Sequence, residues 1–157
     1  MLDGDSASHP LIIDIRPTSE YDKGFITGAI NIPFYRPIEG WSPFKIARRA
    51  AFAAFGVAGT EPNEEFESQV VAASNNGSKN IVICCLMGGS LEELAGQTIP
   101  NLDDQASIQR VRKLQTRSMV AAYQIVNGVG LSSVSILSGG YSGWASGGRS
   151  VSMMIDE

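Results

Sequence analysis

The sequence predicts an α/β fold whose central parallel β-sheet is covered by helices on both faces. Short, mostly apolar runs alternate along the chain with longer stretches of helical character. Strands of a parallel sheet are buried on both faces, so they lack the strict apolar–polar alternation of a half-exposed strand. Strands that alternate with helices are typical of such a sheet.

Four runs are expected to form the strands. LIIDI (11–15) is stopped by Arg16-Pro17, and AINIP (29–33) ends in proline, a residue that closes strands. IVICC (81–85) and VSIL (134–137) are each followed by glycines. Because ligands bind beyond the carboxyl ends of parallel strands, the residues that follow these runs are candidates for a site.

Helices are expected between the strands. Thr18 or Ser19 can cap the first, Ser42 the second and Asn63 the third. Gly24 and Asn-Gly near residue 128 are typical helix ends. A last short helix is expected in GGYSGW, with Trp144 in the core. The longer segments are residues 18–24, 41–56, 63–74 and 117–130.

Composition restricts the classes of function. The chain suits one domain at 11–150, after an N-terminal extension (1–10) and before a C-terminal tail (151–157). A net charge of −4 gives no reason to expect nucleic acid as a partner. The two cysteines are adjacent and cannot form a disulfide framework, which favours a reducing compartment. We expect no metal or organic cofactor, no membrane span and no secretory signal.

The adjacent cysteines raise the main chemical question. Successive side chains of a strand point to opposite faces, so Cys84 and Cys85 cannot share an environment. Cys84 lies inside the apolar run and is expected to pack as a small hydrophobic residue. Cys85 is the last strand residue before a glycine-containing turn, whose N–H groups can hold an anion and favour a thiolate. Composition also allows the alternative that both are buried core thiols.

Three segments resemble the rhodanese family. LIIDIRP…EYDKGFITGAINIP is similar to its Asp-x-Arg strand end and following Gly-Ala-x-Asn turn. IVICCLMGG resembles its catalytic strand and loop, and SVSILSGGYSGW its closing strand, so the resemblance runs from Leu11 to Trp144. The stretch from Ile38 to Phe66 is similar to plant and algal plastid rhodanese-like proteins. The resemblance therefore implies a chloroplast location, in the stroma or at the thylakoid surface.

The resemblance also assigns roles to residues. It makes Cys85 the nucleophile that accepts a sulfane sulfur, carries it as a persulfide and passes it to a thiophilic acceptor. Asp14 and Arg16 flank the end of the first matching strand, where they either form a structural ion pair, the favoured interpretation, or orient the active loop. The expected partners are a sulfur donor and an acceptor, which is a small thiol or a protein. The residues expected to bind the substrate or its anion are Leu86, Met87, Gly88, Gly89, Ser90, Arg117 and Ser118.

The sequence departs from the family in the active loop. The family's loop runs Cys-x-x-Gly-x-Arg-Ser, whereas here residues 90–116 intervene before Arg117-Ser118. Residues 103–115 are compatible with a helix. If that helix ran unbroken into 118, the positive helix end would lie far from Cys85; if Arg117-Ser118 folds back, it would still face the sulfur. A further departure is Phe25, where the family commonly has histidine. The phosphatase activity found in some proteins of this fold requires a Cys-x5-Arg motif. The sequence lacks this motif, so phosphatase activity is not expected.

Two functions from different classes follow. The first is a sulfurtransferase with its persulfide on Cys85. The second is a catalytically weak or inactive accessory subunit that docks on a thylakoid protein complex. Arg48 and Arg49 beside AAFAAF indicate either a basic and aromatic docking face or a packed helix with two solvated arginines. The insertion at 90–116 could cover the active site or bind a partner.

Overall fold

The computed structural model describes residues 9–56, 58–89 and 116–154. Its central sheet has four strands in the order β3-β1-β6-β7, and every neighbouring pair is parallel. All four were expected from the apolar runs, so the predicted α/β fold with a central parallel sheet is confirmed. The strands are β1 (Leu11–Asp14), β3 (Ile30–Asn31), β6 (Ile81–Cys84) and β7 (Val134–Ile136).

The register brings the ends of the two central strands together. Asp14 lies opposite Cys84, and Ile13 lies opposite Ile83. Since the strands are parallel, Arg16 and Cys85 leave the sheet at the same edge. That edge carries the candidate site.

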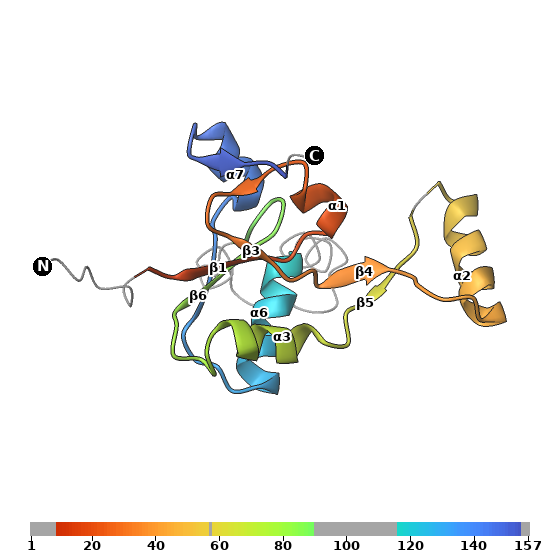
Figure 1. The fold of residues 1–157 in the computed structure, drawn as a ribbon, viewed down its shortest axis with the longest axis horizontal. Coiled ribbons are helices and arrows are strands. Elements are labelled where there is room, and N and C mark those ends of the chain that lie inside the picture. The colour runs from red at the N-terminus through yellow and green to blue at the C-terminus, as the bar shows by residue number, and fades with distance from the viewer. Residues whose placement is uncertain (1–8, 57, 90–115, 155–157) are drawn as a thin grey trace, which may run out of the picture.

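One face of the sheet packs on the helices α3 (Phe66–Ala73) and α6 (Arg117–Gly128), which lie together below the strands in Figure 1. The core on this face is aliphatic and aromatic, and the Phe34 and Phe66 rings meet edge to face at 4.9 Å. Its buried residues include Ile13, Ile15, Phe66, Val70, Ile81, Ile83, Cys85, Ala121 and Ile125.

The opposite face packs on α7 (Gly140–Ser146) and on the antiparallel pair β2 (Phe25–Ile26) and β8 (Val151–Ser152). These elements and α1 (Thr18–Tyr21) lie above the strands in Figure 1. Cys84 belongs to this smaller cluster, whereas Cys85 belongs to the larger one. The two cysteines therefore face opposite sides of the sheet, as the strand alternation predicts. Trp144 is partly buried against the same cluster.

Helix boundaries differ from those expected from sequence. The first helix is capped by Pro17, without a side-chain hydrogen bond, rather than by Thr18 or Ser19. Asn63 does not cap α3 itself but the turn before it, where its Oδ1 accepts from Glu65 N at 3.2 Å. Ser42 caps as predicted, since its Oγ accepts from Lys45 N at 3.3 Å.

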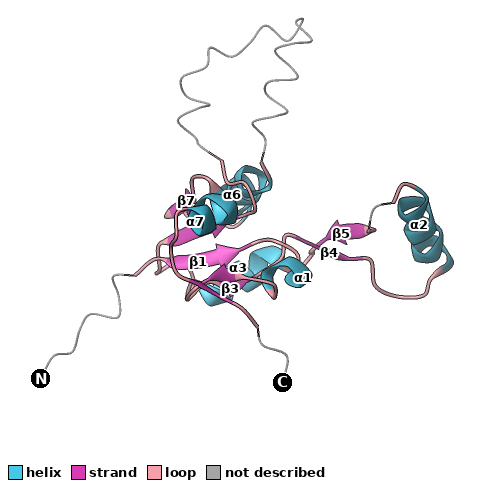
Figure 2. Ribbon diagram, turned by 90° about the horizontal axis from the view of Figure 1, so that it is seen from above, coloured by secondary structure: helices cyan, strands magenta, loops and turns pink. Residues whose placement is uncertain are grey.

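A two-stranded arm extends from the body. Its strands, β4 (Tyr35–Pro37) and β5 (Thr60–Pro62), are antiparallel, and they carry α2 (Pro43–Ala54) away from the sheet (Figures 1 and 2). No residue of α2 is buried. The interpretation of this segment as a helix packed into the body is therefore wrong. Within residues 9–56, 58–89 and 116–154, no helix has the length and apolar character needed to cross a bilayer.

The core on the α3 and α6 side should account for much of the stability. Phe66 is 1% exposed, so Phe66→Ala removes a packed ring and should lower the free energy of unfolding by about 3–5 kcal/mol. Phe44→Ala, on the 75% exposed ring of α2, is the matched control and should change it by less than about 0.5 kcal/mol. Denaturant unfolding of both variants measures the difference, and equal effects would contradict this assignment of the core.

Candidate active site

Cys85 lies directly after β6, where its side chain is only 4% exposed. Its Sγ accepts a hydrogen bond from Gly88 N at 3.2 Å. The thiol lies 3.3 Å from Ser118 Oγ, to which it can donate, and 3.9 Å from Gly88 O. A thiolate at this position would have two donors, the Gly88 N–H and the Ser118 hydroxyl. Hydrogen bonds to the charged form favour it over the neutral thiol.

The loop after Cys85 is held by the turn that opens α7. Tyr141 N donates to Cys85 O at 2.8 Å, and Ser142 N donates to Leu86 O at 2.9 Å. Gly88 (φ 69°) and Gly140 (φ 56°) adopt left-handed backbone conformations and face one another. A Cβ on either would overlap the backbone of the other. Both positions therefore require glycine for two reasons, the backbone angle and the close approach.

Helix α6 begins beside the sulfur. Thr116 has an extended backbone (φ −77°, ψ 158°), so the helix starts at Arg117 and does not continue back through residue 116. Ser118, in the first turn, is fully buried, and its Oγ lies 2.9 Å from Thr116 Oγ1. The positive end of the helix dipole thus faces Cys85, which favours a negative charge there. The expected helix at 103–115 and most of the insertion lie outside the described residues.

Asp14 and Arg16 form a buried ion pair at the adjacent strand end. Arg16 Nη2 donates to Asp14 Oδ2 at 2.7 Å and also to Gly24 O at 2.7 Å. Burial lowers the pKa of Arg16, but the hydrogen bonds and charge of Asp14 outweigh burial and raise it overall. The guanidinium lies 3.8 Å from the centre of the Tyr141 ring. Since Tyr141 N holds the carbonyl of Cys85, the ion pair connects to the active loop.

Cys84 has the opposite chemistry. Burial raises the pKa of its thiol to about 12, and the negative charge of Asp14 adds to this effect, while Arg16 opposes it. The thiol therefore stays protonated at neutral pH and is not a nucleophile. Of the two cysteines, Cys85 is the one that lines the pocket described next.

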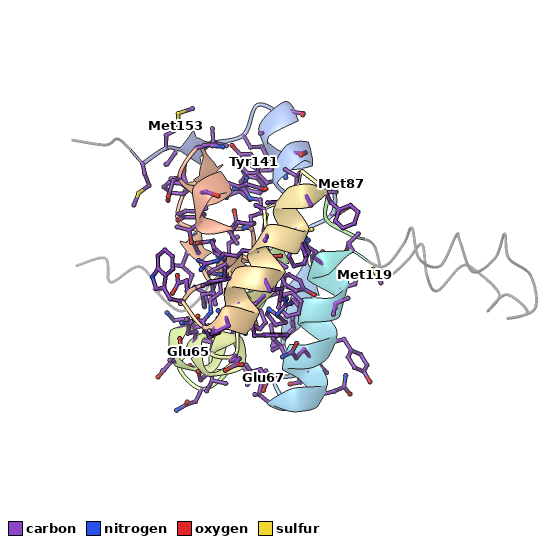
Figure 3. The ribbon with its side chains drawn as sticks, turned by 90° about the vertical axis from the view of Figure 1, so that its right-hand side faces the viewer. Glu65, Glu67, Met87, Met119, Tyr141 and Met153 are labelled. Carbon is purple, nitrogen blue, oxygen red and sulfur yellow. The ribbon has the colours of Figure 1, made fainter. Side chains whose placement is uncertain are left out.

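A pocket of about 420 Å³ opens above Cys85. Met87, labelled in Figure 3, lines the pocket and is 75% exposed. The Arg117 guanidinium is stacked on Tyr35, 5.8 Å from the ring centre. The wall thus combines apolar side chains with a cation. The pocket is lined by Ile15, Arg16, Glu20, Cys85, Leu86, Met87, Thr116 and Arg117.

The residues expected from the family motif divide into three groups. Gly88 and Ser118 contact the sulfur, whereas Leu86, Met87 and Arg117 line the pocket without a hydrogen bond to it. Gly89 lies against Thr116 and Met119 rather than in the pocket. Ser90 lies outside the described residues.

Four contributors were not expected from sequence: Ile15, Glu20, Thr116 and Tyr141. The GGYSGW motif marked the position of Tyr141, but only the fold shows that its ring covers Arg16. Phe25, in place of the family's histidine, stacks on Tyr21 with ring centres 4.3 Å apart. Among the residues that the structure describes, no group of three or more His, Cys, Asp or Glu side chains could hold a metal.

Comparison with known proteins places this geometry in a family. The model of the rhodanese-like domain matches residues 1–147. The chain is 35% identical over 148 residues to "Rhodanese-like domain-containing protein 14, chloroplastic" of Arabidopsis thaliana. The match covers 94% of this chain and 59% of that protein, so the chain spans less than two thirds of its relative.

Solved structures resemble the chain more distantly. The Rhodanese_3-like domain of the Alr3790 protein from Anabaena sp. has a TM-score of 0.45 at 16% identity, covering 95% of this chain and 97% of that domain. The N-terminal domain of a putative ATP/GTP binding protein from Clostridium difficile has a TM-score of 0.47 at 17% identity, with 89% of each chain covered. Because these likenesses are weak, the assignment rests on the sequence comparisons. The chain belongs to the rhodanese-like domain family.

Proposed function

We propose that the chain is a sulfurtransferase that carries sulfane sulfur as a persulfide on Cys85. The observation that carries this proposal is the pair of polar groups at the sulfur, the donor Gly88 N at 3.2 Å and, at the start of α6, Ser118 Oγ at 3.3 Å, which accepts from the thiol and can donate to a thiolate. Backbone N–H groups and a helix N-terminus stabilise an anion without requiring a basic side chain. A thiolate, and the persulfide anion that replaces it, both need such stabilisation.

The first half-reaction can be written for thiosulfate. The Cys85 thiolate attacks the outer sulfur of thiosulfate and forms a new S–S bond. The S–S bond of thiosulfate breaks, and sulfite leaves with its electron pair. The product is a Cys85 persulfide anion, so charge and atoms balance and no external oxidant is required.

The second half-reaction restores the thiolate. A nucleophilic acceptor, such as a thiolate or cyanide, attacks the terminal sulfur of the persulfide. The S–S bond between Cys85 Sγ and the terminal sulfur breaks, and its electron pair stays on Cys85 Sγ as the thiolate. In the pocket, Arg117 supplies positive charge toward anionic donors, because its guanidinium lines the wall. In this proposal the persulfide anion is held by the N–H groups of the loop that follows Cys85, which consists of Leu86, Met87, Gly88, Gly89 and Ser90.

We propose a plastid location, in the stroma or at the thylakoid surface, because the Arabidopsis relative is named chloroplastic. The domain that carries the activity is proposed to span 11–150, with 90–116 as an insertion in its active loop. Asp14 and Arg16 are proposed to orient that loop through Tyr141, whose ring and N–H contact Arg16 and Cys85 O.

A second candidate function is a catalytically weak or inactive accessory subunit of a thylakoid protein complex. The observation that favours it is α2, which carries exposed aromatic rings on an arm outside the body. The two candidates differ in whether Cys85 accepts sulfur.

Persulfide formation separates these candidates. After incubation with thiosulfate, intact-mass measurement of wild type should show the gain of one sulfur atom, because Cys85 lies at the pocket with Gly88 N and Ser118 Oγ beside its sulfur, whereas burial keeps the Cys84 thiol protonated. Cys85→Ser should show no gain, and the matched variant Cys84→Ser should retain it. If folded wild type gains no sulfur from thiosulfate, from a thiosulfonate or from a small persulfide, the sulfurtransferase proposal is refuted and the accessory role is left.

The hydroxyl of Ser118 should support the thiolate. Ser118→Ala removes a hydrogen bond to a charged sulfur and should slow persulfide formation about tenfold or more. Ser135→Ala, at an exposed position of β7, is the control and should leave the rate unchanged. Stopped-time mass spectrometry measures both rates, and an unchanged rate in Ser118→Ala would exclude this role.

The two thiols should differ in their reaction with iodoacetamide. At about pH 8.5 the reagent should modify Cys85 through its pocket and leave Cys84 intact, because a thiol reacts as its thiolate. The pKa of Cys84 is raised to about 12, so its reaction should appear only as the pH approaches that value. In guanidinium chloride both thiols should react alike. Peptide mapping measures each site, and rapid labelling of Cys84 in the native protein would contradict its assignment.

A further inference from the structure

Helix α2 presents its apolar side to solvent and its charged side to the arm. Phe44 is 75% and Ile46 45% exposed, and the alanines that follow on the same side of the helix are exposed as well. Phe55, just after the helix, is 84% exposed, and Trp41, just before it, is 85% exposed. We call this surface the outer face of α2: Phe44, Ile46, Ala47, Ala50, Ala51 and Ala54. It is the reverse of the usual orientation of a surface helix.

The polar side chains of α2 are engaged on its inner side. Lys45 Nζ lies 3.3 Å from Glu61 Oε1 on β5. Arg49 Nη2 donates to Gly40 O at 2.8 Å, and its guanidinium lies 5.2 Å from the centre of the Trp41 ring. Arg48 lies 5.9 Å from the centre of the Phe52 ring. These contacts fix the rotation of the helix, so the apolar outer face is directed outward by the fold itself.

The position of the helix makes this face accessible to a broad surface. The arm holds α2 apart from the sheet, as Figure 2 shows, and Figure 3 views the molecule from the side on which α2 projects in front of the body. The base of the arm is anchored, because Asn63 N donates to Phe34 O at 3.1 Å. At the end nearest α2, Ile38 is 3% exposed and lies with Phe52 beside Gly59. The outer face is therefore a projecting surface rather than the wall of a groove.

Charge indicates what covers this face. Helix α2 has three cations, Lys45, Arg48 and Arg49, and no acidic residue, although the whole chain has a net charge of −4. Glu61 pairs with Lys45, whereas Arg48 and Arg49 lie over the Phe52 and Trp41 rings. Positive charge is thus concentrated beside the exposed apolar face. A helix with aromatic and apolar residues on one side and only basic charges on the other is typical of helices that lie in the interface of a bilayer.

We propose that α2 docks on the surface of a lipid bilayer with anionic headgroups. The outer face enters the boundary between headgroups and acyl chains, with Phe44 and Phe55 as its aromatic anchors, and Trp41, which lies against Arg49, stays near the headgroups. Arg48 and its neighbouring cations stay at the level of the headgroups, where they attract phosphate. This inference does not depend on sulfur transfer, since no residue of α2 lines the pocket above Cys85.

A second copy of the chain fits this surface less well. Two outer faces packed together would bury the apolar side chains but would offer Arg48 and Arg49 no opposite charge, because α2 itself has no acidic residue. An anionic bilayer instead satisfies both the apolar and the cationic parts of the surface.

Vesicle flotation tests the proposal. Wild type should float with vesicles of phosphatidylcholine containing about 30 mol% phosphatidylglycerol and bind far less to pure phosphatidylcholine. Raising the salt to about 0.5 M should weaken binding, because the Debye length shortens. Phe44→Ser with Phe55→Ser should reduce the bound fraction at least about tenfold, as two exposed rings are lost. Arg48→Gln should reduce affinity about fivefold.

Matched controls keep the test independent of folding. Tyr123→Ser with Met153→Ser removes two exposed side chains, 71% and 66% exposed, that lie outside α2, and should leave flotation unchanged. In a Trp144→Phe background, Trp41 is the remaining tryptophan, and its emission should shift to shorter wavelength with anionic vesicles. Thermal unfolding followed by circular dichroism in every variant reports that the fold is intact, whether or not Cys85 accepts sulfur.

Three results would overturn the proposal. One is wild type that does not float with anionic vesicles and shows no shift of Trp41 emission. Another is flotation that survives Phe44→Ser with Phe55→Ser, because binding would then lie elsewhere. The third is a dimer in sedimentation velocity, without lipid, that the same double variant dissociates, which would assign the outer face to a second copy of the chain.

Discussion

The buried pair of Asp14 and Arg16 is the interaction on which the active end of the sheet depends. Two charges at the end of β1 are almost fully removed from water, which is unfavourable unless every polar atom is engaged. Arg16 meets that condition with Asp14, Gly24 O and the face of the Tyr141 ring. Tyr141 N then holds the carbonyl of Cys85, so contacts run without interruption from β1 to the active loop.

The same ion pair contributes to the different environments of the two cysteines. Asp14 lies opposite Cys84 in the sheet, and its charge, added to burial, keeps that thiol protonated. Cys85 is on the other face and receives the Gly88 N–H and the Ser118 hydroxyl. Because Arg16 is engaged by Asp14, charge stabilisation at the sulfur falls to backbone dipoles and the start of α6. A site of this kind binds a small anion without a basic side chain in contact with it.

The sequence predicted the parts of this arrangement that follow from local pattern. Alternation along β6 separated Cys84 from Cys85, and the family motif identified Gly88 and Ser118 as partners of the sulfur. It did not predict Tyr141 over Arg16 or the glycine turns that face one another, because these contacts join segments far apart in the chain. The orientation of α2 was also missed. Periodicity shows that a helix has an apolar side, but tertiary contacts decide where that side points.

The arm connects the pocket above Cys85 with the exposed face of α2. Tyr35 begins β4 and stacks with Arg117, a wall residue of the pocket, while the preceding Phe34 packs on Phe66 in the core. The other end of the arm is held by the ion pair of Lys45 with Glu61. A helix on a flexible tether would leave the pocket free to turn relative to any surface it bound. Here ordered contacts occur at both ends of a short antiparallel ladder, so a surface that binds α2 also sets the direction in which the pocket above Cys85 opens.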